Sequence, residues 1–137
     1  MGTIRVLSDQ DIEALLHRAI IGRISCCDHG KSGRPYLVPL AYGYDGENIY
    51  AHSGPGRKLN FMRAEPRVTF EVDEGIAPDN WQSVIVEATF SEIVDPAEQL
   101  RALRTLYPAP AAIPDLGAMT TIFKLAITAK SGRYETP

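Results

Sequence analysis

The strongest constraint on the fold is a two-residue alternation of side chains, interrupted by turn residues at short intervals. Candidate strands, rich in β-branched and aromatic residues, occupy residues 24–27, 35–44, 48–53, 67–72, 83–94 and 121–129. Together with Asp45-Gly46 as a hairpin turn, this spacing is typical of antiparallel strands. It predicts a mainly β fold, a six-stranded antiparallel barrel that is closed or nearly closed, with helices at the periphery. So small a barrel holds only side chains, so a ligand is expected in an outer groove or at a subunit interface.

Three short helices are predicted around these strands. Ser8 can cap the first, whose apolar residues recur at helical spacing over residues 12–19 and would cover the core. A second runs from about residue 58 to 63. The third begins after Asp95, a good capping residue, with Pro96 at its first position.

Length and charge limit the classes of protein to which the chain can belong. Its 137 residues, 45% of them hydrophobic, suit a single domain over residues 1–137. A net charge of -3 argues against nucleic-acid binding through a broad basic surface. No stretch approaches the ~18 apolar residues of a membrane span, and acidic residues follow the N-terminus where a signal peptide would be apolar. We therefore expect a cytoplasmic protein without a membrane segment.

The two cysteines, Cys26 and Cys27, are adjacent on a predicted strand. Neighbouring side chains on a strand point to opposite faces, so this pair cannot chelate one metal ion without distorting the backbone. We expect one thiol in the core, the other on the opposite face, and no metal site.

One segment stands out on this acidic chain. Residues 57–67 hold four cations and one anion, and Gly54-Pro55-Gly56 directly precedes Arg57 and Lys58 at the start of the second helix. Neither a P-loop nor a dinucleotide fingerprint fits, because Leu59 occupies the position that each motif needs for another residue. Glycine amides, the positive end of a helix and two cations nevertheless suit a compact dianion such as a phosphate monoester. The alternative is a simple tight turn with both cations solvated.

Four ordered segments together make a more specific pattern. They are YLVPLAY at residues 36–42, IYAHS at 49–53, GRKL at 56–59 and WQSV at 81–84. Their series resembles the pyridoxamine 5′-phosphate oxidase-like FMN-binding split-barrel family, and within it the nitroimidazole-resistance (Nim-like) branch. The resemblance covers nearly the whole chain.

This resemblance implies a homodimer with two FMN molecules in grooves between the subunits. Arg57 and Lys58 would hold the phosphate, helped by His52 and Ser53. The other implied cofactor contacts are Val38, Pro39, Leu40 and Ala41 along the isoalloxazine edge, and, from the partner chain, Ser83 with Trp81 or Gln82.

The resemblance also implies a flavin-dependent oxidoreductase that reduces a small electrophile, such as a nitroaromatic or a quinone, with electrons from NADH or NADPH. The flavin carries hydride chemistry, so no catalytic residue is assigned. The chain ends at residues 133–137 without the Trp/Arg substrate motif of pyridoxamine phosphate oxidases proper, so that activity is not expected. The alternatives are a flavin- or haem-binding protein without turnover, with His52 as a haem ligand, and a deazaflavin in place of FMN.

Overall fold

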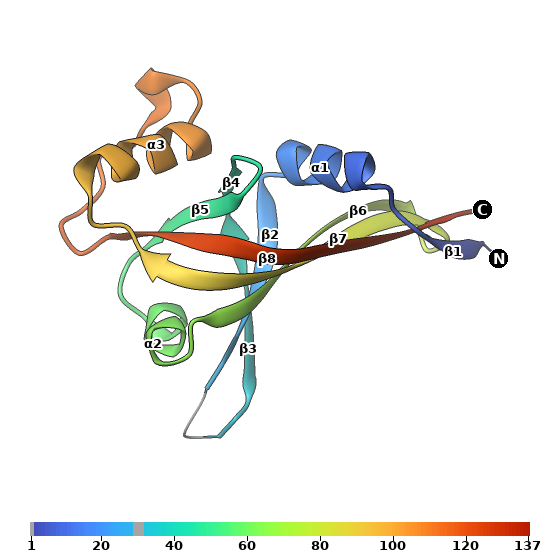
Figure 1. Cartoon of the computed structure of the whole chain (residues 1–137), viewed down its shortest axis with the longest axis horizontal. Helices are drawn as coiled ribbons and strands as arrows, with labels where there is room; N and C mark the ends of the chain where they lie inside the picture. The colour runs from blue at the N-terminus through green and yellow to red at the C-terminus, as the bar shows by residue number, and fades with distance from the viewer. Residues whose placement is uncertain (1, 29–31) are drawn as a thin grey trace.

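The structure is a computed structural model that describes residues 2–28 and 32–137 (Figure 1). Its strands are β1 (Thr3–Val6), β2 (Ile21–Cys27), β3 (Pro35–Ala41), β4 (Gly43–Tyr44), β5 (Asn48–Ser53), β6 (Arg67–Ala77), β7 (Asn80–Glu92) and β8 (Thr121–Thr136). Its helices are α1 (Asp9–Arg18), α2 (Arg57–Ala64) and α3 (Pro96–Leu106), with a 3-10 turn at Pro110–Ala112. Within these residues, no helix is both long and apolar enough to span a bilayer.

All described strands belong to one antiparallel sheet in the order β3-β2-β6-β7-β8-β5-β4, with β1 paired to β8. The prediction of a mainly β split barrel with peripheral helices is confirmed, with eight strands in place of six. The predicted strand 35–44 is divided at Tyr42, so that β3 pairs with β2 and β4 pairs with β5. β3 and β4 are the two edge strands of the sheet, yet they are consecutive in the chain. The sheet therefore curves until its edges approach each other, but these edges do not pair.

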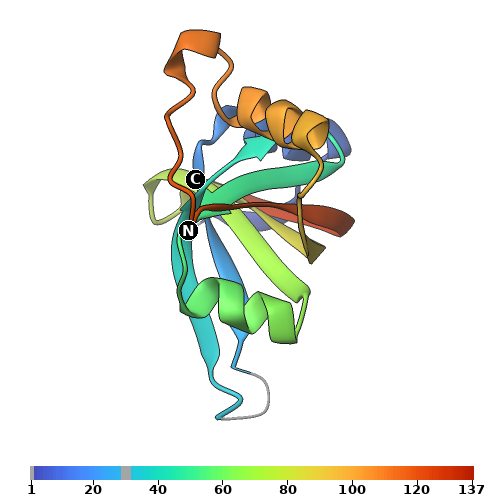
Figure 2. The same cartoon turned by 90° about the vertical axis from the view of Figure 1, so that its left-hand side faces the viewer.

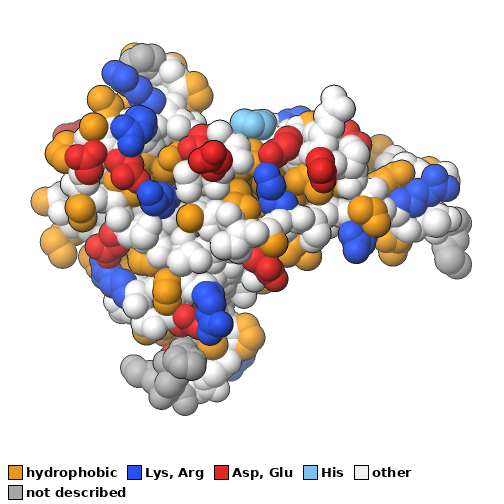
Figure 3. All heavy atoms as spheres, viewed as in Figure 1, with side chains coloured by type: hydrophobic (Ala, Val, Ile, Leu, Met, Phe, Trp, Pro, Cys, Tyr) orange, Lys and Arg blue, Asp and Glu red, His pale blue; other side chains and the backbone are white. Residues whose placement is uncertain are grey.

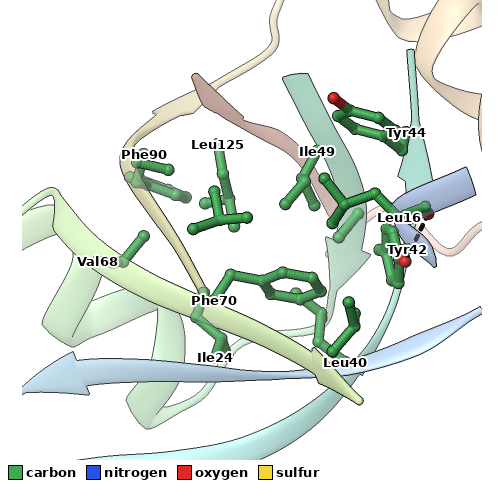
Figure 4. Packing of buried hydrophobic residues seen from close by; sticks show 14 of the residues in the cluster. Leu16, Ile24, Leu40, Tyr42, Tyr44, Ile49, Val68, Phe70, Phe90 and Leu125 are labelled. Carbon is green, nitrogen blue, oxygen red and sulfur yellow. Dashed lines mark hydrogen bonds between the residues drawn. The ribbon is translucent and has the colours of Figure 1, made fainter. Parts of the chain in front are cut away.

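Large apolar side chains fill the space that the curved sheet encloses (Figure 4). Phe70 and Phe123 are completely buried there, as are Leu15 and Leu16 of α1. The cap of α1 is as predicted, since the Ser8 hydroxyl accepts the backbone N–H of Asp11 at 3.1 Å. The predicted role of this helix as a cover over the core is therefore confirmed.

The predicted placement of the two thiols is also confirmed. Cys26 is buried in the core, while Cys27 on the same strand is only half-buried.

Helix α3 lies over the sheet (Figure 2), and a second, smaller core lies between the helix and the strands. It consists of Tyr50, Ile93, Ala102 and Ile122. The predicted cap is present, because the Asp95 carboxylate accepts the backbone N–H of Glu98 at 3.0 Å. This core fixes α3 over the strand ends that lead into the glycine-rich segment.

A projecting ribbon, which we call the arm, consists of β1 and residues 73–77 of β6, 80–85 of β7 and 131–136 of β8 (Figure 1). The predicted strands 67–72 and 121–129 end before the arm, whereas the structure continues them to Ala77 and Thr136. Pairing with neighbouring strands explains the difference. The end of β6 pairs with the start of β7 across a tight turn, and the end of β8 pairs with β7 and with β1, which are distant in sequence.

Candidate functional site

The N-terminus of α2 differs from those of α1 and α3. Gly56 is its N-cap and offers no side-chain hydrogen bond, and its first turn contains no acidic residue. By contrast, α1 and α3 each have a capping side chain and acids in the first turn. The first N–H groups of a helix have no partner within the helix and carry partial positive charge. At α2 these groups remain available to an anion.

The glycines before α2 leave open space. A Cβ added to Gly54 or to Gly56 would meet nothing within 4 Å. Gly56 has extended backbone, with φ 167°, a conformation open to any residue. Glycine is therefore not needed at these positions to avoid a steric clash within the chain or to adopt a left-handed backbone. Their small size gives a ligand or a second chain access to the backbone.

Arg57 and Lys58 begin α2 beside this space. The Arg57 guanidinium lies 6.0 Å from the centre of the Tyr36 ring, and Tyr36 makes an edge contact with Phe61 of α2. Lys58 is half-buried, and its charge helps to lower the pKa of His52. Among residues 2–28 and 32–137, neither cation forms an ion pair with a carboxylate. The positive charge at this point is thus not neutralised by the described part of the chain.

His52 and Ser53 end β5 next to the same segment. The Nε2 atom of His52 lies 2.7 Å from the hydroxyl of Tyr107, and the two rings are stacked. Burial, with a smaller contribution from Lys58, lowers the pKa of His52, so the neutral imidazole is favoured. The Ser53 hydroxyl donates to the carbonyl oxygen of Gly54 at 2.9 Å.

Tyr107 is a site residue that sequence reasoning missed. It is the C-cap residue of α3 and lies 55 positions from His52 in the chain. No local pattern indicates such a contact, because it depends on how α3 packs over β5.

The four residues of β3 that are predicted to contact the cofactor lie on two faces, because successive strand residues point to opposite sides. Leu40 is buried in the core, and Val38 is half-buried and packs against it. Pro39 and Ala41 are exposed on the opposite face, opposite Arg23 and Ile21 of β2. A groove on that outer face would therefore be lined by the side chains of Pro39 and Ala41, while Val38 and Leu40 could contribute only backbone atoms.

Trp81, Gln82 and Ser83 lie on the arm, at the opposite end of the molecule from α2 (Figure 1). Trp81 donates its Nε1 proton to Glu135 at 3.0 Å. Gln82 points to the other face of the strand and donates to Glu74 at 2.5 Å. A single chain therefore does not bring these residues to Arg57 and Lys58.

Comparison with known proteins identifies the family. The sequence profile of the family described as pyridoxamine 5′-phosphate oxidase matches residues 8–134. The chain belongs to this family. An uncharacterised protein of Rhizobium meliloti (strain 1021) is 31% identical to it over 96 residues, which are 70% of this chain and 60% of that relative. The matched region is therefore less than two thirds of the relative's length.

Solved structures similar to this pyridoxamine 5′-phosphate oxidase family member include a FAD-binding protein from Mesorhizobium loti. It is 33% identical with a TM-score of 0.79, and the match covers 97% of this chain and 99% of that one. A candidate 5-nitroimidazole antibiotic resistance protein from Bacteroides thetaiotaomicron is 20% identical with a TM-score of 0.82. That match covers 97% of this chain and 88% of that one, and at this identity it supports the fold alone.

Proposed function

We propose that the protein binds the FMN unit of a flavin, with the phosphate at the N-terminus of α2, and acts as a flavin-dependent oxidoreductase. The observation that carries this proposal is the pair Arg57 and Lys58, which lack carboxylate partners in the described chain and adjoin open glycine backbone. The FAD-binding relative from Mesorhizobium loti, similar over nearly the whole length, supports a flavin ligand. FAD contains the FMN unit, but its phosphate there is joined to that of AMP and carries one negative charge in place of two.

The residues fit a phosphate monoester in charge and in space. Charge-assisted hydrogen bonds from Arg57 and Lys58 would contribute roughly 1.5 to 3 kcal/mol each. The positive end of α2 adds roughly 0.3 to 1 kcal/mol. Ser53 can contribute its hydroxyl by turning from the carbonyl of Gly54, to which it now donates.

We propose that a second copy of the chain completes the site. The face of the arm that carries Trp81 and Ser83 also carries apolar side chains in solvent, with Val6 67% and Ile85 47% exposed. Apolar groups exposed in this way on one sheet face are typical of a surface covered by a partner. A homodimer would cover them and bring Trp81 and Ser83 toward the partner's cofactor.

When bound, a flavin supplies hydride transfer to a small electrophile such as a nitroaromatic or a quinone, and accepts electrons from NADH or NADPH. The chain itself binds and orients the group. The neutral imidazole of His52, held by Tyr107, adds no further positive charge to the phosphate site.

The same contact disfavours the alternative in which His52 binds haem iron. The Nε2 atom, one of the two possible iron ligands on the ring, already lies 2.7 Å from the Tyr107 hydroxyl. Iron coordination through Nε2 would require this hydrogen bond to break.

The decisive experiment is an absorbance titration of the purified protein with FMN and, in parallel, with FAD and a deazaflavin. Arg57→Ala/Lys58→Ala is expected to weaken flavin binding at least about tenfold, because it removes two charge-assisted bonds. The matched control is Arg101→Ala/Arg104→Ala, which removes the same charge from exposed positions on α3.

Five outcomes would each overturn part of the proposal. The phosphate site is contradicted if the protein binds none of these flavins, or if Arg57→Ala/Lys58→Ala binds flavin as tightly as wild type does. A haem spectrum in place of flavin bands supports the alternative ligand. Flavin that NADH and NADPH fail to bleach indicates binding without turnover, and sedimentation as a monomer contradicts the shared site.

A further inference from the structure

The two cations at the start of α2 differ in depth and in surroundings. Lys58 is half-buried, and its charge acts on two groups from different strands, the imidazole of His52 on β5 and the thiol of Cys26 on β2. Arg57 is exposed and lies toward β3, where its guanidinium is 6.0 Å from the centre of the Tyr36 ring (Figure 2). One positive charge is therefore recessed, and the other is at the surface.

This arrangement suits two linked phosphates better than one. FMN carries two negative charges on a single phosphate, whereas FAD carries one on each of two phosphates that share an oxygen atom. Lys58 and Arg57 are consecutive, so one diphosphate can reach both. The first turn of α2 has no acidic residue that would repel the second phosphate, and an added Cβ at Gly54 or Gly56 meets nothing within 4 Å. The N-terminus of α2 thus offers both charge and room for a diphosphate.

An aromatic surface adjoins the outer cation. Phe61 follows Arg57 by four positions, so the two side chains lie on one face of α2. The rings of Phe61 and Tyr36 meet edge to face, with centroids 5.5 Å apart and an angle of 81° between their planes. Both rings are half-buried and pack against the main core, which holds them in place. A fixed ring that is partly open to solvent is a surface on which a nucleobase can stack.

The Arg57 side chain can turn away from this ring. Its guanidinium lies at the outer limit of about 6 Å for a contact between a cation and an aromatic face. It forms no ion pair with a carboxylate of the described chain. A phosphate is therefore a stronger partner for the guanidinium than the ring is. When the guanidinium turns to a phosphate, it uncovers the ring of Tyr36.

Long-range attraction contributes little to this site. On the face of the molecule that Figure 3 shows, basic and acidic side chains are interspersed. The chain as a whole has a net charge of -3. A nucleotide would therefore be held by local contacts with α2 and β3.

We propose that this face of α2 and β3 binds the adenylate half of FAD. Lys58 holds the phosphate next to the flavin, Arg57 holds the phosphate next to the adenosine, and the adenine stacks on the ring of Tyr36. The inference rests on the proposed flavin site and deepens it, because it makes FAD the preferred cofactor over FMN.

The first experiment compares the affinities of the full-length protein for FAD and for FMN by absorbance titration. Wild type is expected to bind FAD at least about fivefold more tightly, because a base stacked on an aromatic side chain contributes roughly 5- to 150-fold in affinity. Lys58→Ala should weaken the binding of both flavins and leave the preference for FAD in place. Arg57→Ala should reduce that preference, because the second phosphate loses its cation. Arg101→Ala, an exposed change on α3, is the control.

Tyr36→Leu tests the adenine contact. This change keeps an apolar side chain against the core and removes the aromatic ring, so the preference for FAD should fall roughly 5- to 150-fold. Tyr134→Leu is the matched control, because Tyr134 is also half-buried against the main core but lies on the arm. The FMN titration of each variant shows in the same experiment that the variant still folds.

ADP and inorganic pyrophosphate separate the contribution of the adenosine from that of the phosphates. Both probes are titrated against bound FAD, and neither contains an isoalloxazine ring. ADP should displace FAD at a lower concentration than pyrophosphate does. With Tyr36→Leu this difference between the two probes should shrink.

The outcomes distinguish this inference from the proposed function. A protein that binds neither FMN nor FAD contradicts both. A protein that binds FMN at least as tightly as FAD overturns the adenylate site alone. The adenylate site is overturned equally if Tyr36→Leu and Tyr134→Leu show the same preference, or if ADP displaces FAD no better than pyrophosphate does.

Discussion

Glu71 is expected to make the free energy of unfolding depend on pH. It lies on the outer face of β6 near Asp73, and Nη1 of Arg23 is 3.5 Å from the Glu71 carboxylate and 3.1 Å from that of Asp73. Partial burial, followed by the hydrogen bond and charge of Asp73, raises the pKa of Glu71 from 4.5 to about 7. Arg23 opposes this rise without cancelling it.

The direction of this pH dependence follows from the number of protons that the folded and unfolded chains bind. Between pH 4.5 and about 7 the folded chain keeps a Glu71 proton that the unfolded chain has lost. The stabilisation from this group is therefore complete below pH 4.5 and is lost as the pH rises to about 7. The difference between 7 and 4.5 corresponds to about 3 kcal/mol at full strength. Because 29% of the Glu71 side chain and 42% of Arg23 are exposed, solvent screening leaves about 1 to 2 kcal/mol.

Urea denaturation of wild type and Glu71→Gln at about pH 5 and about pH 7.5 measures this contribution. The variant cannot ionise, and its amide can still donate to Asp73. The difference in unfolding free energy between the two proteins is expected to change by about 1 to 2 kcal/mol between the two pH values. Glu87→Gln, an exposed change on β7, is the control. A difference that stays constant with pH at fixed protein concentration would refute the reasoning.

Two further predictions concern α3. Tyr107→Phe removes the hydroxyl beside Nε2 of His52 but leaves the burial and the Lys58 charge that lower the pKa of His52, so this pKa should stay below its ordinary value; an NMR titration of the imidazole that gives the ordinary value would contradict this. Gly43→Ala places a Cβ 2.7 Å from the backbone of Thr105 and should lower the free energy of unfolding by about 1 to 3 kcal/mol, whereas Gly54→Ala, in open space, should leave it unchanged. Equal urea midpoints for these two variants would count against the close packing of α3.

The sequence predicted the features that depend on neighbouring residues. Ser8 and Asp95 cap their helices as expected, because a capping side chain and the N–H that it accepts are three positions apart. The Asp45-Gly46 turn also forms, with Gly46 at φ 99°, because the two strands that it joins are adjacent in sequence.

The arm could not be predicted in this way. All four residues of β1 are exposed and show no alternation of burial. The strand exists because it pairs with residues 133–136 at the other end of the chain. By their sequence alone, Asp73 and Glu74 are typical of a polar loop. They continue β6 because β7 pairs with them. The contact of His52 with Tyr107 depends on the same kind of distant packing.

The alternation of β7 constrains how a second copy can complete the cofactor site. Successive strand residues face opposite sides, so Trp81 and Ser83 share the outer face with Ile85, whereas Gln82 lies on the other face with Glu74 and Tyr134. A partner that approaches the apolar outer face would meet Trp81 and Ser83, and the side chain of Gln82 would remain on the far side of the strand. The proposed flavin site would therefore require a second chain on the outer face of the arm.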